Sequence, residues 1–204
     1  MAMNEHCEAV YKQVVRQKCY EALAEAGFTR FRKEGVDWPM EHGFHCWVGL
    51  NTAIEPEYIA INPFVGVHVV PIEKLISIKI GKYPMKYDRR VATYAVHMGQ
   101  LVPKERVFRF TRGTDIEAEA ARLARLYVDV GLPYALSIGA YELLLPLLQE
   151  RVPMLGAYPE RVASCLCLMG RKEEAQSFVE GFLRDHRDYF EGFAAPFLKM
   201  LSSK

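Results

Sequence analysis

Residues 43–51, GFHCWVGLN, and residues 57–70, EYIAINPFVGVHVV, decide the fold that this sequence predicts. Both runs are rich in aromatic and β-branched residues, which suit a pleated and half-buried surface. The segment between them, TAIEP at 52–56, has the residue types of a turn, so the two runs predict neighbouring antiparallel strands. Pro63 and Gly66 interrupt the second run and predict a bulge or an edge position, because proline donates no hydrogen bond to a ladder.

Further strands are expected on both sides of this pair. FTRFRKEG at 28–35 alternates aromatic with basic residues, and the intervening VDWPMEHG at 36–43 has turn residues. VATYAVHMGQLVP at 91–103 and ERVFRFTRG at 105–113 also have strand patterns. The segment at 71–81 fits either a short helix or another strand, and its opening Pro-Ile-Glu favours the helix.

Helical patterns occupy the rest of the chain. Residues 4–26 carry apolar or small residues at helical spacing and stop before Gly27. The run at 114–131 begins with Thr114 or Asp115 as the N-cap, has acidic residues in its first turn, and ends at Gly131. More helices are expected at 133–150, 158–169, 172–186 and 188–201.

The expected fold class is therefore α+β. It has an N-terminal helix, an antiparallel sheet of about five strands and a C-terminal helical region. We expect a single domain over 1–204, with a helix and sheet layer at 1–113 and a helical layer at 114–204.

Charge and cysteine usage limit the kinds of partner. The 26 basic and 25 acidic side chains leave a net charge of +1, which argues against nucleic acid or an anionic membrane as a partner. The N-terminus has charges where a signal peptide needs an apolar run, and no stretch approaches the roughly 18 apolar residues of a membrane span. An odd number of cysteines without a small secreted framework indicates a reducing compartment, so we expect a cytoplasmic protein. The cysteines are Cys7, Cys19, Cys46, Cys165 and Cys167.

Motifs that carry chemistry are missing from the sequence. It has no GxGxxG or GxxxxGK[ST] for phosphates, no GxSxG elbow and no HExxH helix, so we expect no catalytic residues and no cofactor. The alternative is a metal-dependent hydrolase that uses His42, His45, His68 and His97 of the sheet, with three of them as zinc ligands. No metal-type local spacing accompanies these histidines, so we expect no metal site.

The phrases WVGLN (47–51), INPFVGVH (61–68) and VGLPYA (130–135) resemble, in order and spacing, a family of uncharacterised bacterial proteins of about this length. The helix, sheet and helix arrangement is similar to immunity proteins, which neutralise toxins exchanged between bacteria. The resemblance implies a non-catalytic protein that binds a cognate toxin.

Two polar and projecting segments are the candidates for this contact: the loop at 37–43 and the acidic helix entry after residue 114. The oligomeric state is left open. The candidate binding residues are Asp37, Trp38, Glu41, His42, Asp115, Glu117 and Glu119.

Overall fold

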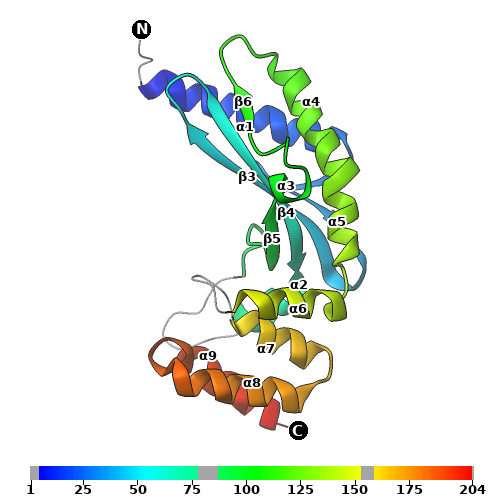
Figure 1. Ribbon diagram of the computed structural model, residues 1–204, viewed down its shortest axis with the longest axis vertical. Coiled ribbons are helices and arrows are strands. Elements are labelled where there is room, and N and C mark those ends of the chain that lie inside the picture. The colour runs from blue at the N-terminus through cyan, green and yellow to red at the C-terminus, as the bar shows by residue number, and fades with distance from the viewer. Residues whose placement is uncertain (1–4, 78–86, 153–158, 204) are drawn as a thin grey trace. The chain divides into compact units, whose positions relative to one another are not determined.

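The structure is a computed structural model that describes residues 5–77, 87–152 and 159–203 (Figure 1). It confirms the α+β class, with an N-terminal helix, an antiparallel sheet and C-terminal helices. The chain divides into two compact units. The first, which we call the sheet unit, contains Met1–Val67 and Ala95–Ser137, and the second, the helical unit, contains His68–Tyr94 and Ile138–Lys204.

This division differs from the expected layers at 1–113 and 114–204. Residues 114–137 belong with the sheet, because their helices pack on it, and residues 68–94 belong with the C-terminal helices. The single domain over 1–204 stays a prediction.

The sheet has six strands in the order β1-β2-β3-β4-β5, and β6 pairs with β4. The strands are β1 (Thr29–Arg32), β2 (Gly35–Pro39), β3 (Phe44–Ile54), β4 (Ile59–Val69), β5 (Tyr94–His97) and β6 (Phe108–Phe110). The sixth strand is β2, which lies in the segment expected to be a turn. That expectation was wrong because Val36 and Asp37 are buried and the strand pairs with both of its neighbours.

Pro63 lies in an interior strand, so an edge position for it was wrong. The ladder between β4 and β6 covers Ile59, Ala60 and Ile61 and stops before the proline, which has no N–H to donate. The expected strand at 91–103 is also shorter than predicted. It ends at His97, whose Nδ1 accepts from the Gly99 N–H and caps the short helix α3 (Met98–Leu101).

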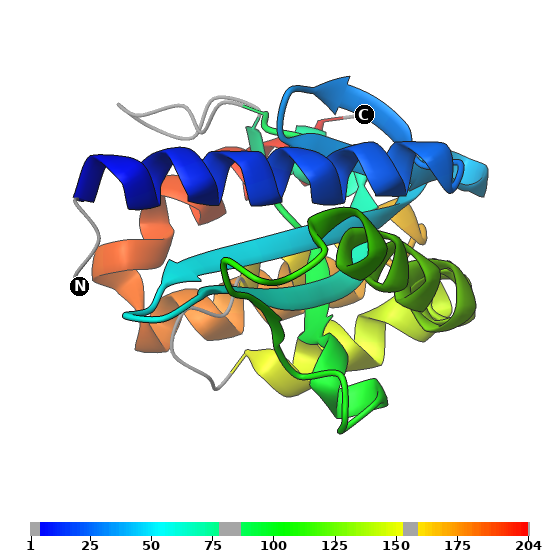
Figure 2. The ribbon, with the colours of Figure 1, turned by 90° about the horizontal axis from the view of Figure 1, so that it is seen from above.

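Helices of the sheet unit pack against the sheet and each other. They are α1 (Glu5–Glu25), α4 (Ile116–Leu126), a π-helical turn η2 (Tyr127–Gly131) and α5 (Leu132–Ser137). Helix α1 lies beside α4 and contacts β2 and β3, as Figure 2 shows from above. Asp115 is the N-cap of α4, which settles the choice between Thr114 and Asp115.

Gly131 does not end the helix, contrary to the sequence prediction. The π-helical turn passes directly into α5, so Gly131 is a packing position. A Cβ atom there would lie 3.1 Å from Tyr127 Cδ1 and 3.2 Å from Val65 Cγ2. The glycine therefore lets the helix approach the sheet closely.

Tyr127 is the largest fully buried side chain in this core. Its hydroxyl lies 3.0 Å from the carbonyl oxygen of Gly49 on β3 and 2.9 Å from that of Phe64 on β4. A buried hydroxyl needs such a partner, because an unsatisfied one costs about 1–3 kcal/mol. The residue therefore fixes the helix to both central strands.

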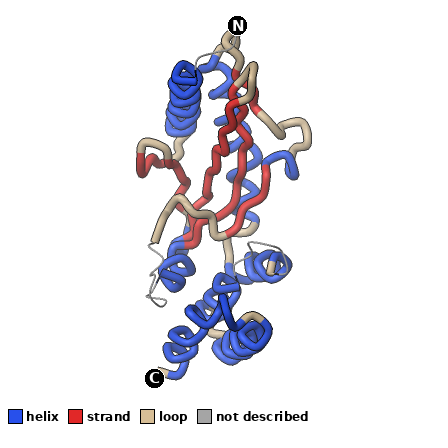
Figure 3. The backbone as a smooth tube through the Cα atoms, turned by 90° about the vertical axis from the view of Figure 1, so that its left-hand side faces the viewer, coloured by secondary structure: helices blue, strands red, loops and turns tan. Residues whose placement is uncertain are grey.

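The helical unit is built from five helices within the described part of the chain (Figure 3). They are α2 (Val70–Ser77), α6 (Tyr141–Arg151), α7 (Pro159–Leu168), α8 (Lys172–Asp185) and α9 (Arg187–Ser202). Helix α7 packs against α2, α6 and α8, and α8 packs against α9. Gly170 has φ 76° in the α7–α8 turn, a left-handed conformation that glycine adopts without strain.

Helix α2 confirms the helical interpretation of 71–81 as far as Ser77, and residues 78–81 lie outside the described residues. The helix expected at 133–150 is two helices, α5 and α6, separated by residues 138–140. Within the described ranges, no single helix is long and apolar enough to cross a bilayer. The bent pair 116–137 and 141–151 meets those criteria only when taken together, and its large apolar residues Leu123, Tyr127 and Leu144 are buried.

Candidate functional site

The β2–β3 hairpin contains four of the seven candidate binding residues. Its ladder pairs Asp37 with Trp47, Trp38 with Cys46 and Pro39 with His45. Directly opposite residues of an antiparallel pair point to the same side of the sheet, so Asp37, Trp47 and His45 share one face and Trp38 lies on the other. The hairpin is therefore a regular two-stranded scaffold.

Asp37 does not project from the hairpin, contrary to the sequence prediction. Its side chain is only 2% exposed, and its Oδ1 lies 3.4 Å from Nδ1 of His45. Burial of a carboxylate is costly unless hydrogen-bonding or charged groups surround it. We therefore assign Asp37 to the support of the hairpin and not to a contact surface.

Trp38 is half-buried and also has a packing role. Its ring meets that of Phe28 edge to face, with centroids 5.5 Å apart. A Cβ atom on Gly27 would lie 2.9 Å from Trp38 Cζ3, so the indole packs directly on the chain that leaves α1. This contact ties the hairpin to the first helix.

The tip of this hairpin, Met40–Gly43, carries the two candidate residues that do project. The Met40 N–H donates to the Phe44 carbonyl at 2.8 Å and closes the turn. Glu41 and His42 have side chains that are 94% and 81% exposed. His42 has φ 55° and ψ 26°, the left-handed conformation, and no other non-glycine residue in the described chain has a positive φ.

The acidic entry of α4 is used mainly within the fold. Asp115 Oδ1 accepts from the Ala118 N–H at 3.0 Å as the N-cap. Glu117 pairs with Lys18 of α1 at 3.1 Å, and Glu119 receives two hydrogen bonds from Arg122. Asp115 and Glu119 thus stabilise α4 itself and Glu117 joins α4 to α1, while Asp115 and Glu117 remain exposed.

The sheet histidines have separate surroundings. His45 contacts Asp37, His97 caps α3 and meets the Phe64 ring at 4.9 Å, and His68 is buried with Nδ1 2.7 Å from the Val91 carbonyl. In the parts of the chain that the structure describes, no three His, Cys, Asp or Glu side chains come together as metal ligands. The geometry thus offers no support for the three-histidine site.

Burial disfavours the reactive thiolate form of four cysteines. Burial raises the pKa of the Cys19, Cys46 and Cys165 thiols to about 12, and it also raises the pKa of Cys167. A thiol in such surroundings remains protonated at neutral pH. Cys46, the neighbour of His45 in sequence, lies on the opposite side of β3.

The sequence patterns did not predict a buried polar cluster in the helical unit. Arg161 of α7 donates to Glu73 of α2, and the Thr93 hydroxyl donates to the same carboxylate at 2.8 Å. The Val69 N–H in turn donates to the Thr93 hydroxyl oxygen at 2.9 Å. The available signal was one lone acid in the apolar run of α2 and one lone arginine in the apolar run of α7.

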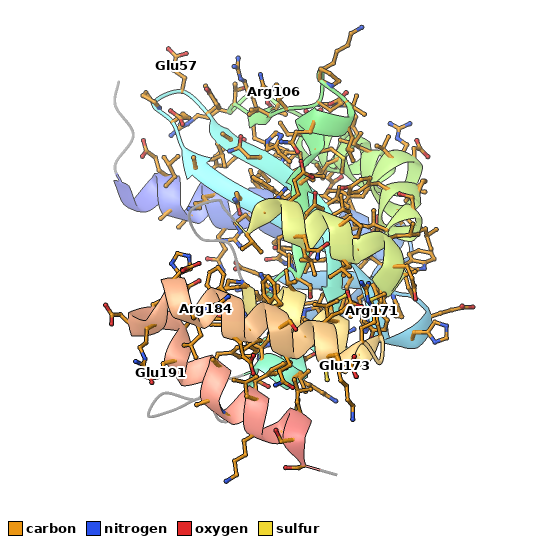
Figure 4. The ribbon with its side chains drawn as sticks, turned by 60° about the horizontal axis from the view of Figure 1, so that its bottom comes forward. Glu57, Arg106, Arg171, Glu173, Arg184 and Glu191 are labelled. Carbon is orange, nitrogen blue, oxygen red and sulfur yellow. The ribbon has the colours of Figure 1, made fainter. Side chains whose placement is uncertain are left out.

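An open groove on α8 was also missed. Its volume is about 650 Å³, within the range of ligand sites. Figure 4 labels Arg184, which lies on α8. The described residues of its lining are Ser177, Glu180, Gly181, Leu183, Arg184 and Arg187.

Comparison with known proteins finds no detectable relative of this chain. No protein-family model matches the chain, and no curated protein or solved structure is detectably similar to it.

Proposed function

We propose that this protein is a non-catalytic binding protein that docks onto a partner protein through the tip of its β2–β3 hairpin. The observation that carries the proposal is the backbone of His42. A non-glycine residue in the left-handed region costs about 1 kcal/mol, and glycine would avoid that cost. Strained backbone of this kind clusters at binding and active sites.

The fold gains little from the side chains at this tip. His42 Nε2 lies 3.9 Å from Glu41 Oε2, and both groups are almost fully exposed, so solvent screens their interaction. A histidine and a glutamate that face water on a strained turn are available to a partner. They supply one imidazole and one carboxylate that can hydrogen-bond to a partner.

The rest of the hairpin supports a preformed contact. The cross-strand contact of Asp37 with His45 and the packing of Trp38 on Phe28 hold the strands that present the tip. A loop on a rigid scaffold loses little conformational entropy on binding, which favours affinity. The protonated and buried cysteines fit binding better than nucleophilic chemistry.

The partner that we propose is a cognate bacterial toxin, on the basis of the resemblance to immunity proteins. The test is a growth assay in which the product of the neighbouring gene and this protein are expressed from separate inducers. We expect the neighbouring product to arrest growth and this protein to restore it. A neighbouring product without toxicity contradicts the toxin as partner.

The same assay tests the tip. A Glu41→Lys, His42→Ala double variant should lose protection while its circular dichroism stays unchanged. Glu57→Lys is the matched control, because Glu57 is an exposed glutamate in the β3–β4 turn of the same unit (Figure 4). Full protection by the tip variant contradicts the assignment of this surface.

A further inference from the structure

The groove on α8 has a floor made by small residues. Ser177 and Gly181 are four positions apart on one face of the helix, and Arg184 follows three positions later. Glycine inside a helix costs about 0.5–1 kcal/mol relative to alanine. Packing does not require it here, because the nearest atom to a Cβ at Gly181 would be Arg184 Nη2 at 3.8 Å.

Two arginines are among the charged residues that line the groove. Arg184 makes no ion pair with any described residue, and Arg187 reaches Glu191 only at 3.6 Å, with both side chains more than half exposed. Glu180 is the one acid among the described lining residues, and its Oε1 accepts from Gln176 at 2.8 Å. The surface therefore offers two guanidinium groups that an incoming carboxylate can engage in pairs of hydrogen bonds.

We propose that this groove binds an acidic segment of a partner protein. A volume of about 650 Å³ exceeds what a single carboxylate or phosphate fills, which favours a longer occupant such as a stretch of chain. The small floor lets its backbone approach α8, and the arginines bind its carboxylates. The inference goes beyond the hairpin contact, because all the groove residues named belong to the helical unit.

The test is fluorescence anisotropy with a labelled oligoglutamate peptide and the full chain. We expect binding that weakens as salt is added, since the contacts are charged and exposed. Arg184→Glu should weaken binding about tenfold. Gly181→Leu should weaken it similarly by filling the floor, while raising helix propensity, so that the fold is kept.

Lys172→Glu is the matched control, because it makes the same charge change at the far end of α8. The proposal is overturned if Lys172→Glu weakens binding as much as Arg184→Glu, since the attraction would then be a general one. It is also overturned if Gly181→Leu binds the peptide like the unaltered protein. Inorganic phosphate and a single-stranded oligonucleotide are tested as competitors at equal concentration of charge. If either one displaces the peptide, the groove binds that ligand class and a peptide partner is rejected.

Discussion

Arg161 Nε on α7 donates a hydrogen bond to Glu73 Oε1 on α2 at 2.8 Å, and the two side chains are 7% and 8% exposed. The partners come from segments 88 residues apart in the chain. Each has apolar neighbours along its own helix, where burial of a charge is costly, and the ion pair offsets that cost for both. This pair therefore specifies how α2 packs on α7.

Removal of one partner should be far more damaging than removal of both. Glu73→Leu or Arg161→Met removes one member of a buried ion pair and should lower the free energy of unfolding by about 3–5 kcal/mol. The double variant should recover most of that loss. Urea unfolding followed by circular dichroism measures both, and a double variant as unstable as the sum of the single variants would contradict the pairing.

The hydroxyl of Tyr127 should contribute to stability through the two carbonyl groups it reaches. Tyr127→Phe leaves the carbonyls of Gly49 and Phe64 without this donor and should cost about 1–3 kcal/mol in thermal or urea unfolding. Tyr189→Phe is the control, because Tyr189 is 59% exposed. Equal stability of the Tyr127→Phe variant and the unaltered protein would reject this role.

The buried thiols should resist alkylation in the folded protein. Because burial raises the pKa of Cys19, Cys46 and Cys165 to about 12, iodoacetamide at pH 8 should modify them only after unfolding. The half-buried Cys167 should react sooner. Mass spectrometry of digested protein measures each site, and rapid native labelling of Cys46 would contradict its burial and indicate a reactive thiol.

His97 should make the fold sensitive to mild acid. Burial lowers the pKa of its imidazole, and the nearby Arg106 charge adds to this effect. As pH falls below the ordinary histidine value of about 6.5, the unfolded chain binds the proton first, so the free energy of unfolding decreases. Above that pH the His97 contribution is constant.

His97→Asn isolates this contribution. Asparagine keeps an acceptor for the Gly99 N–H but does not titrate, so the variant should lose less stability between pH 7 and pH 5 than the unaltered protein. Urea unfolding at both pH values gives the comparison. The same pH dependence in both proteins would exclude His97 as its source.

The fold could be predicted where local patterns and packing agree. The strand patterns around Trp47 and Val65 and the cap at Asp115 depend on residues close in the chain, and the structure confirms them. Strand β2 was misread because Pro39 and Gly43 mark a turn, while the pairing that makes the preceding residues a strand is set by distant partners. Gly131 was misread because a glycine needed for close packing has the same sequence signal as a helix end.

The candidate site was predicted in part for the same reason. Exposure of Glu41 and His42 follows from a polar turn and could be read locally. Burial of Asp37 depends on His45 across the ladder, and the Glu73–Arg161 pair depends on two segments that local reasoning treats separately. Tertiary contacts of this kind give only a weak signal in the sequence, such as a single charged residue in an otherwise apolar helix.

We propose that His42 is kept on a strained turn because a partner binds it. Glycine relieves the strain, so His42→Gly should leave stability unchanged or raise it by up to about 1 kcal/mol. The decisive measurement is calorimetric titration of the purified product of the neighbouring gene with the unaltered protein and with this variant. We expect binding that the variant weakens about tenfold or more, and equal affinity of the two proteins would contradict a role of His42 in binding.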